Sequence, residues 1–374
     1  MKKVFIISSL ILAVILLFLG IYNVAFKNNP YDPKVADKTV AKEQSSDASP
    51  TMEEQSESSQ QDATISPVTE EKVIAPSYRK ETDSVIYISP ADASVKEISL
   101  PMLSARTLMQ LSGAPIQAVW SPDSSHALVE IRDGNGTRWH AVDVGTNTDV
   151  PLKAGMESPA WSNLGDKIIY KYFNASSKER TLNVADPDGG NWKSLGDVPF
   201  PKMGMMPIPQ SSLIALWNQG DAFEETSLRS IPITGGEMKS LLSGQFGADY
   251  RFSPDGSRII ASISDKKGGE FRNLLIPTLV SKVAWSADGQ SLYYALPGNI
   301  PPGSVLPNDY YSKPILTQDT FWKVDLSSQD KKQRLVDLSS IDKGYDASRL
   351  FLDADERYLF FMNRTDGKLY RIRL

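Results

Sequence analysis

The sequence predicts an all-β protein, a β-propeller preceded by a transmembrane helix and a disordered linker. A five-residue core recurs along the chain, for instance at Phe252–Gly256 and Trp285–Gly289: an aromatic residue, Ser, a variable residue, Asp and Gly. Apolar and β-branched residues flank the cores, which is typical of two strands joined by a tight turn. Four strand-like runs fit into about 40 to 45 residues, the period of a propeller blade, and the 3.6-residue pattern of helical repeats is absent. Little helix is therefore expected beyond the amino-terminal segment.

The amino-terminal segment, residues 1–27, contains the predicted transmembrane helix. An almost unbroken apolar run covers residues 4–25 and follows Lys2 and Lys3. A bilayer is crossed by about 20 apolar residues, and lysines ahead of such a run favour a cytoplasmic amino terminus. A cleaved signal peptide is the alternative, for which residues 23–25 form a poor cleavage site. The sequence thus predicts a single-pass protein of the cell membrane with its propeller on the extracytoplasmic side, periplasmic or extracellular.

A polar linker and the propeller follow this anchor. Residues 28–72 are rich in Ser, Gln, Glu, Asp, Thr and Pro and contain few large apolar side chains. Such a stretch buries too little apolar surface to offset the entropy of ordering it, so it is predicted to be a disordered tether. The remaining residues, 73–374, are predicted to form the propeller.

Each position of the repeated core has an expected structural role. The leading aromatic residue should lie between neighbouring sheets, the Asp should cap amides of the turn, and the Gly should supply the positive φ that the turn needs. An apolar residue follows at the same distance after each leading residue, at the start of the next strand. The five copies begin at Trp120, Trp161, Phe252, Trp285 and, in degenerate form, Leu352.

The spacing of the cores predicts the number of blades. The interval from Trp161 to Phe252 is about twice that from Trp120 to Trp161, which predicts a degenerate copy near residue 206, where residues 206–215 retain a turn and the later apolar position. Strand-like runs ahead of Trp120 match the later strands of one more unit that lacks its innermost strand. The count favours seven blades, with six as the alternative if the incomplete units at the two ends of the chain share one blade.

The tandem W-S-P-D-G type core, as in Trp120–Ser124, Phe252–Gly256 and Trp285–Gly289, resembles the WD-like repeat of TolB-type β-propellers. The same repeat occurs in the propeller domains of prolyl-oligopeptidase-type peptidases. The resemblance covers about residues 84–374, and it implies the fold while leaving the activity open. The chain departs from TolB, a soluble periplasmic protein with a separate α/β domain, because an anchor and a tether stand in that place. A lipoprotein partner like that of TolB is therefore not implied.

Composition and motifs argue against several kinds of site. The net charge of −5 and the lack of a Lys/Arg-rich run argue against nucleic-acid binding. With no Cys and only His126 and His140, the chain offers no disulfide, thiolate zinc site or His-rich metal centre, and no cofactor is predicted. Residues 186–191 resemble a calcium loop, but Gly190 stands where a ligand is needed, so a plain turn is favoured.

The sequence also predicts that the protein is not an enzyme. A peptidase of the related kind needs a G-x-S-x-G motif and an α/β-hydrolase domain, and the chain has neither the motif nor the residues for the domain. A sialidase-like glycosidase needs an arginine cluster, a Tyr nucleophile and acids at the ring centre, whereas the recurring Asp residues occupy equivalent turn positions. The alternative is a propeller enzyme or a small-molecule- or glycan-binding protein that uses the central channel.

The candidate functional site is a long Pro-rich loop between the last two cores, at residues 296–314. Long loops in compact domains are often functional, and aromatic side chains commonly anchor interfaces. Two interpretations stay open: the tyrosines of the loop contact a partner, or the loop folds over the propeller and buries them. The predicted function is a protein–protein interaction or scaffold module that binds proteins of the cell envelope. The predicted partner-binding residues are Pro307, Asn308, Asp309, Tyr310 and Tyr311.

Overall fold

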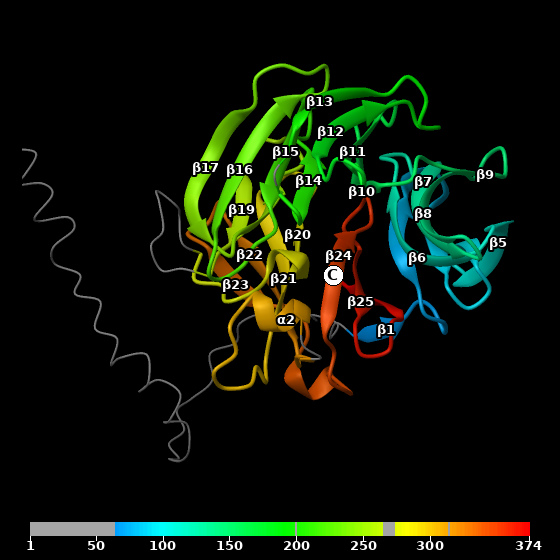
Figure 1. The fold of residues 1–374 in the computed structure, drawn as a ribbon. Helices are drawn as coiled ribbons and strands as arrows, with labels where there is room; N and C mark the ends of the chain where they lie inside the picture. Colours follow the sequence, from blue (N-terminus) through cyan, green and yellow to red (C-terminus); the bar gives the residue numbers. More distant parts are fainter. Residues whose placement is uncertain (1–63, 199, 265–273, 313–314) are drawn as a thin grey trace, which may run out of the picture. The chain divides into compact units, whose positions relative to one another are not determined.

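The computed structural model describes residues 64–198, 200–264, 274–312 and 315–374. Regular structure in these residues is almost entirely β-strand and forms six four-stranded antiparallel sheets and one two-stranded sheet (Figure 1). Four blades follow one another in the first half of the chain. They are β2 (Ile74–Arg79), β3 (Ser84–Ser89), β4 (Ser94–Ser99) and β5 (Ser104–Gln110); β6 (Ala114–Trp120), β7 (His126–Asp133), β8 (Gly136–Asp143) and β9 (Thr148–Pro151); β10 (Met156–Trp161), β11 (Ile168–Phe173), β12 (Arg180–Ala185) and β13 (Lys193–Asp197); and β14 (Met203–Pro207), β15 (Leu213–Asn218), β16 (Glu225–Pro232) and β17 (Lys239–Phe246).

The second half contains the two-stranded sheet and two further blades. The sheet is β18 (Asp249–Phe252) with β19 (Ile259–Ser262), and the next blade is β20 (Val283–Trp285), β21 (Ser291–Leu296), β22 (Thr320–Asp325) and β23 (Lys331–Arg334). The last blade combines β24 (Ala347–Leu352), β25 (Tyr358–Asn363) and β26 (Leu369–Arg373) with β1 (Ile65–Pro67). β1 pairs antiparallel with β26, so strands from both ends of this structured region complete one blade.

The favoured count of seven blades is wrong, because the described residues form six four-stranded blades, the number given as the alternative. The core at Phe252 heads a sheet of only two strands, and residues 265–273, which follow β19, lie outside the described part. The first unit, predicted to lack its innermost strand, has it in β2. A bulge at the positive-φ residue Ala75, followed by Pro76, breaks the alternation by which a strand is recognised in sequence.

The predicted transmembrane helix over residues 4–25 lies outside the described residues. Among the described residues, none of the helices has the length and apolar character to cross a bilayer. Most of the predicted linker is likewise outside the described part. Its last residues include β1, so ordered structure begins before the expected boundary at residue 73.

Strand order gives the propeller two distinct ends. The first strands of neighbouring blades contact one another, as β2 does with β6 and β10 with β14, so these strands surround the centre. Because neighbouring strands are antiparallel, the turns from first to second strand lie at one end of the blades, together with the turns from third to fourth. We call this the motif end, since it carries the repeated cores. Connections from second to third strand, and from each blade to the next, lie at the opposite end, which we call the loop end.

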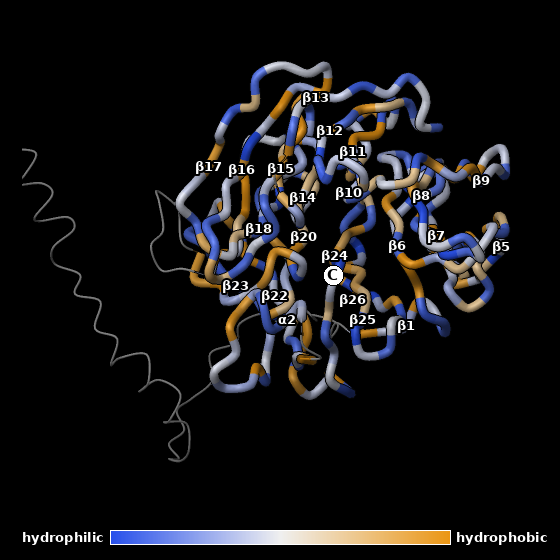
Figure 2. The backbone as a smooth tube through the Cα atoms, viewed as in Figure 1, coloured by the Kyte–Doolittle hydropathy of each residue, from blue (hydrophilic) through white to orange (hydrophobic). Residues whose placement is uncertain are grey.

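The apolar core is divided among the junctions between neighbouring blades. One cluster joins Ile86 of β3 to Val129 of β7, and another joins Ile169 of β11 to Leu216 of β15. The cluster that contains Phe360 and Val85 joins the last blade to the first. Figure 2 accordingly shows hydrophobic residues distributed through all the blades. Each sheet is stabilised by its neighbours on both sides, which is the basis of the propeller fold.

The repeated cores perform the structural roles predicted for them. The indole nitrogens of Trp120 and Trp161 donate hydrogen bonds to backbone carbonyls of the preceding blade, at Ala75 (2.6 Å) and Val119 (2.9 Å). The Asp123 carboxylate accepts from the Ser121 hydroxyl at 2.5 Å and from a backbone amide two residues later at 3.1 Å. Gly256 has a φ of +70°, which an L side chain rarely adopts.

Candidate functional site

The predicted partner-binding loop connects β21 to β22 at the loop end and contains the short helix α2 (Asn308–Ser312). Its contacts extend to other sheets. The Asn308 side chain accepts a hydrogen bond from the Ala222 amide at 2.8 Å and donates one to the Asp221 carboxylate at 3.0 Å, in the β15–β16 connection. The Ser264 hydroxyl donates to the Leu306 carbonyl at 2.7 Å. The loop is therefore fixed against the propeller by partners distant in sequence.

Beneath α2 lies a buried ionic network centred on Lys282, whose side chain is completely buried. The Lys282 ammonium donates to Oδ2 of Asp319 at 2.5 Å and to Oδ1 of Asp346 at 2.7 Å. It also donates to the Ala347 carbonyl at 2.7 Å and contacts the Thr317 hydroxyl at 3.2 Å. The two carboxylates are as fully buried as the lysine. Burying a lysine side chain is costly unless partners of this kind compensate for the lost hydration.

Arg364, from the last blade, and Tyr310, from α2, complete the network. Nη1 of Arg364 donates to Oδ2 of Asp346 at 2.9 Å, and the Tyr310 hydroxyl donates to Oδ1 of the same carboxylate at 2.7 Å. The Arg364 guanidinium also lies 4.1 Å from the centre of the Tyr310 ring. Two cations and two carboxylates thus balance one another, and Tyr310 attaches α2 to them.

The ionisation of the two carboxylates differs for a physical reason. Burial opposes ionisation of Asp346, but Lys282, Tyr310 and Arg364 outweigh it, so the pKa of Asp346 is lowered. Burial dominates at Asp319 and raises its pKa despite the contact with Lys282. Burial and the hydrogen bond to Asp346 raise the pKa of the Tyr310 hydroxyl, which therefore stays a hydrogen-bond donor. Every polar group of the network has a partner, so the network acts as an anchor.

The structure separates the two tyrosines of the predicted site. Tyr310 is only 2% exposed, whereas Tyr311 is 48% exposed and its hydroxyl lies 3.5 Å from that of Ser281. Pro307 is buried, while Asn308 and Asp309 are half-buried and engaged in hydrogen bonds within the protein. Of the five predicted residues, Tyr311 alone is exposed.

Sequence reasoning missed the residues of the network. Lys282, Asp346 and Arg364 stand directly beside a strand at the loop end, where a charged residue is usually exposed. Topology places them together because each is at a strand end and those ends belong to neighbouring blades. The sequence did contain one signal for the network: a charged residue adjoins each of several apolar strands at the end that becomes the loop end.

The first strands, which surround the centre, carry three more charged residues that bear on a candidate site: Asp249, Arg251 and Arg349. Arg251 of β18 is half-buried and donates to the Val283 carbonyl of β20. Arg349 of β24 is exposed, lies at a bulge with a φ of +51°, and has no hydrogen-bond or ion-pair partner among the described residues. Burial lowers the pKa of Arg251, partly opposed by the Asp249 carboxylate and assisted by the like charge of Arg349. Arg251 and Arg349 are therefore near enough for their charges to interact, although the β20–β23 blade stands between β18 and β24.

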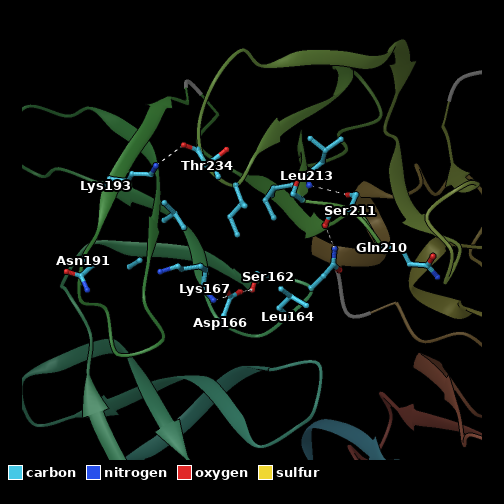
Figure 3. Close-up of a pocket in the computed structure, with 16 residues that line it drawn as sticks. Ser162, Leu164, Asp166, Lys167, Asn191, Lys193, Gln210, Ser211, Leu213 and Thr234 are labelled. Atoms are coloured by element: carbon cyan, nitrogen blue, oxygen red, sulfur yellow. Dashed lines mark hydrogen bonds between the residues drawn. The ribbon is translucent and has the colours of Figure 1, made fainter.

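A cavity of about 660 Å³ opens at the motif end between blades β10–β13 and β14–β17 (Figure 3). Its lining includes the turn after β10, the ends of β12 and β16, and the start of β15. Figure 3 shows Lys167, Asn191 and Lys193 on one side and Ser211 and Leu213 on the other. No group of three or more His, Cys, Asp or Glu residues within the described ranges is arranged to hold a metal ion.

Comparisons with known proteins support the fold and leave the activity open. No protein-family profile matches the sequence, and no curated protein matches it. The oligogalacturonate lyase of Vibrio parahaemolyticus is similar in structure, with a TM-score of 0.62, 11% identity, and 84% of this chain and 94% of that chain covered. The β-propeller domain of Cps50 (Swd1) from Myceliophteria thermophila gives a TM-score of 0.55 at 10% identity, covering 83% of this chain and 99% of that one.

A TolB structure from Acinetobacter baumannii is also among the similar structures. It has 12% identity, a TM-score of 0.39, and covers 78% of this chain and 63% of that chain. The structures with TM-scores above 0.5 support a β-propeller fold, whereas the likeness to TolB is too low to support any conclusion. At these identities a shared fold does not transfer an activity.

Proposed function

We propose that this chain is a non-enzymatic β-propeller that binds a protein partner at its loop end, with α2 as the central contact. The observation that carries the proposal is the division of roles between the two tyrosines of α2. Tyr310 is buried against Asp346 and holds the helix in place, whereas Tyr311 is 48% exposed beside it. Exposed aromatic side chains on a rigid support contribute strongly to interfaces, because they lose little conformational entropy on binding.

The supports on either side of α2 favour a preformed binding surface. Asn308 ties the helix to the β15–β16 connection, and Tyr310 ties it to the last blade. A one-turn helix has little stability alone, so these contacts determine its position. A surface fixed before binding loses less entropy in the complex, which raises affinity without additional contacts.

Site-specific photocrosslinking in cells tests this proposal. A photoreactive amino acid replaces Tyr311 in one variant and Trp192 in a control, because Trp192 is a comparably exposed aromatic residue (51%) near the motif end. We expect one defined protein to crosslink at position 311 and not at 192, and its recovery to fall in the Tyr311→Ala protein. Equal crosslinking at both positions, or none at 311, would contradict the proposal.

A second candidate function is the binding of a small anionic ligand in the central channel. Arg251 and Arg349 support it, because Arg349 is exposed and without a partner among the described residues. Guanidinium groups are well suited to bind carboxylates, with which they form paired hydrogen bonds.

Ligand-induced stabilisation distinguishes this candidate. The purified propeller is heated with a panel of mono- and dicarboxylates, and a binder should raise Tm with the logarithm of its concentration once that concentration exceeds Kd. Arg349→Gln should abolish that rise. Arg373→Gln, which removes an exposed arginine from β26, should preserve it. An unchanged response in Arg349→Gln would exclude the channel site.

A further inference from the structure

The cavity at the motif end is bounded by apolar side chains from two blades. Val184 and Ala185 close it from the end of β12, and Leu213 and Ile214 from the start of β15. Ile233, just after β16, completes this apolar part. A volume of about 660 Å³ lies within the range of small-molecule sites, about 300 to 1,000 Å³. A cavity of this volume holds a small molecule and is too small to enclose a folded protein partner.

The rim of this cavity is the place where one repeated core departs from the others. The four other cores have Asp in the fourth position, at Asp123, Asp255, Asp288 and Asp355, whereas this core has Leu164. Leu164 is 86% exposed and lines the cavity. A single exposed leucine is common on protein surfaces, but this one adjoins an apolar cavity at a position the repeat assigns to a carboxylate.

Other residues of this turn make the hydrogen bonds that hold it, so its stability does not depend on the side chain of Leu164. The Ser162 hydroxyl, which would bond to an Asp at position 164, donates instead to the carboxylate of Asp166 at 2.7 Å. Asn163 occupies the position of Pro122 and Pro254, and its amide donates to the carbonyls of Ile208 (2.7 Å) and Ser211 (2.8 Å) on the next blade. These bonds fix the two walls relative to each other and free position 164 for an apolar side chain.

The charged groups at the rim favour an anion. Lys193 donates to the Thr234 carbonyl at 2.7 Å and has no acidic partner among the described residues. Lys167 is paired with Asp186, and Asp166 is engaged by Ser162. Lys193, whose bond to Thr234 is drawn in Figure 3, is therefore the cation at the β13 side of the cavity that has no acidic partner among the described residues.

We propose that this cavity binds a small amphiphilic anion, with its apolar chain against Val184, Leu213 and Ile233 and its carboxylate at Lys193. Leu164 covers the apolar chain from the rim. Burial of a chain of several methylene groups supplies the affinity, because each apolar group removed from water favours binding. The lysine determines the orientation and the preference for an anion. This site is independent of the partner-binding surface at the loop end.

Calorimetric titration of the purified protein with decanoate tests the proposal, with decylammonium at the same concentrations as the matched probe of opposite charge. We expect decanoate to bind at least tenfold more tightly than decylammonium. Lys193→Glu should weaken decanoate binding at least tenfold. Lys178→Glu, which reverses an exposed charge at the loop end of the same blade, should leave binding within twofold.

Leu164→Asp provides a second variant that restores the repeat residue at an exposed position, where folding is not at risk. We expect it to weaken decanoate binding at least fivefold with Tm unchanged. Equal binding of the two amphiphiles, or decanoate binding that neither Lys193→Glu nor Leu164→Asp alters, would overturn the proposal. So would a site that binds only an acidic peptide and leaves decanoate in solution.

Discussion

The chain departs from its repeat at two places, the ionic network under α2 and the cavity between blades β10–β13 and β14–β17. The network buries charged groups that pair with one another, whereas the cavity leaves apolar groups and one lysine open to solvent. Under α2, Lys282, Asp319 and Asp346 are buried, and together with the half-buried Arg364 they neutralise one another. At the cavity between blades β10–β13 and β14–β17, an apolar wall is left open beside Lys193, whose charge has no acidic partner among the described residues. A network whose members are all satisfied holds the structure in place. An open apolar wall beside the charged Lys193 is instead available to bind a ligand.

Removing the central cation of the closed junction should have the largest effect on stability. Lys282→Met would leave the carboxylates of Asp319 and Asp346 buried without the ammonium, which typically costs about 3–5 kcal/mol. Urea denaturation should show this as a lower midpoint with little change in slope. Lys178→Met, a control at an exposed position, should change the free energy of unfolding by less than about 0.5 kcal/mol. A loss below about 1 kcal/mol for Lys282→Met would mean that the network is not an anchor.

Removing a single hydroxyl from the same junction should have a smaller effect. Tyr310→Phe keeps the ring against Arg364 but deletes the hydrogen bond to Asp346, which is worth about 1–3 kcal/mol because its acceptor is charged. Hydrogen exchange should also become faster at the amides of α2 than in the blades. Tyr311→Phe serves as the control, since its hydroxyl is 3.5 Å from Ser281, and it should leave both measurements unchanged.

The ordinary repeat turns predict a weak dependence of stability on acid pH. Burial opposes ionisation of Asp123, but hydrogen bonds from Ser121 and Ser125 outweigh it and lower its pKa to about 2. Because an unfolded Asp has a pKa of about 3.9, this stabilisation is complete above pH 4 and is lost as the pH falls towards 2. The urea midpoint of Asp123→Asn should therefore fall less between pH 4 and 2 than that of the natural protein. Parallel profiles would show that the turn carboxylate does not couple to folding.

Much of the fold could be predicted from the sequence because the repeat has a local physical cause. The Ser-x-Asp turns and the tryptophans between blades follow from residues adjacent in sequence. The number of blades could not be predicted, since Ala75 and Pro76 conceal β2 and since the turn at Phe252 does not reveal how many strands follow.

The candidate site could be predicted only in part, because its residues meet through topology. The loop was recognised by its length, but two adjacent tyrosines look alike in sequence, and only their neighbours determine which one is buried. Lys282, Asp319 and Asp346 come from three separate connections and resemble ordinary surface charges. Leu164 was visible as a departure from the repeat, and its meaning depended on the cavity beside it.

The most direct test of the central claim is the affinity of the partner captured at the loop end. The dissociation constant is measured for the natural protein, for Tyr311→Ala and for Trp192→Ala, each shown to have an unchanged Tm. We predict that Tyr311→Ala binds at least tenfold more weakly, a difference of about 1.4 kcal/mol or more, and that Trp192→Ala binds as the natural protein does. An unchanged dissociation constant for Tyr311→Ala would contradict the assignment of the loop end as the binding surface.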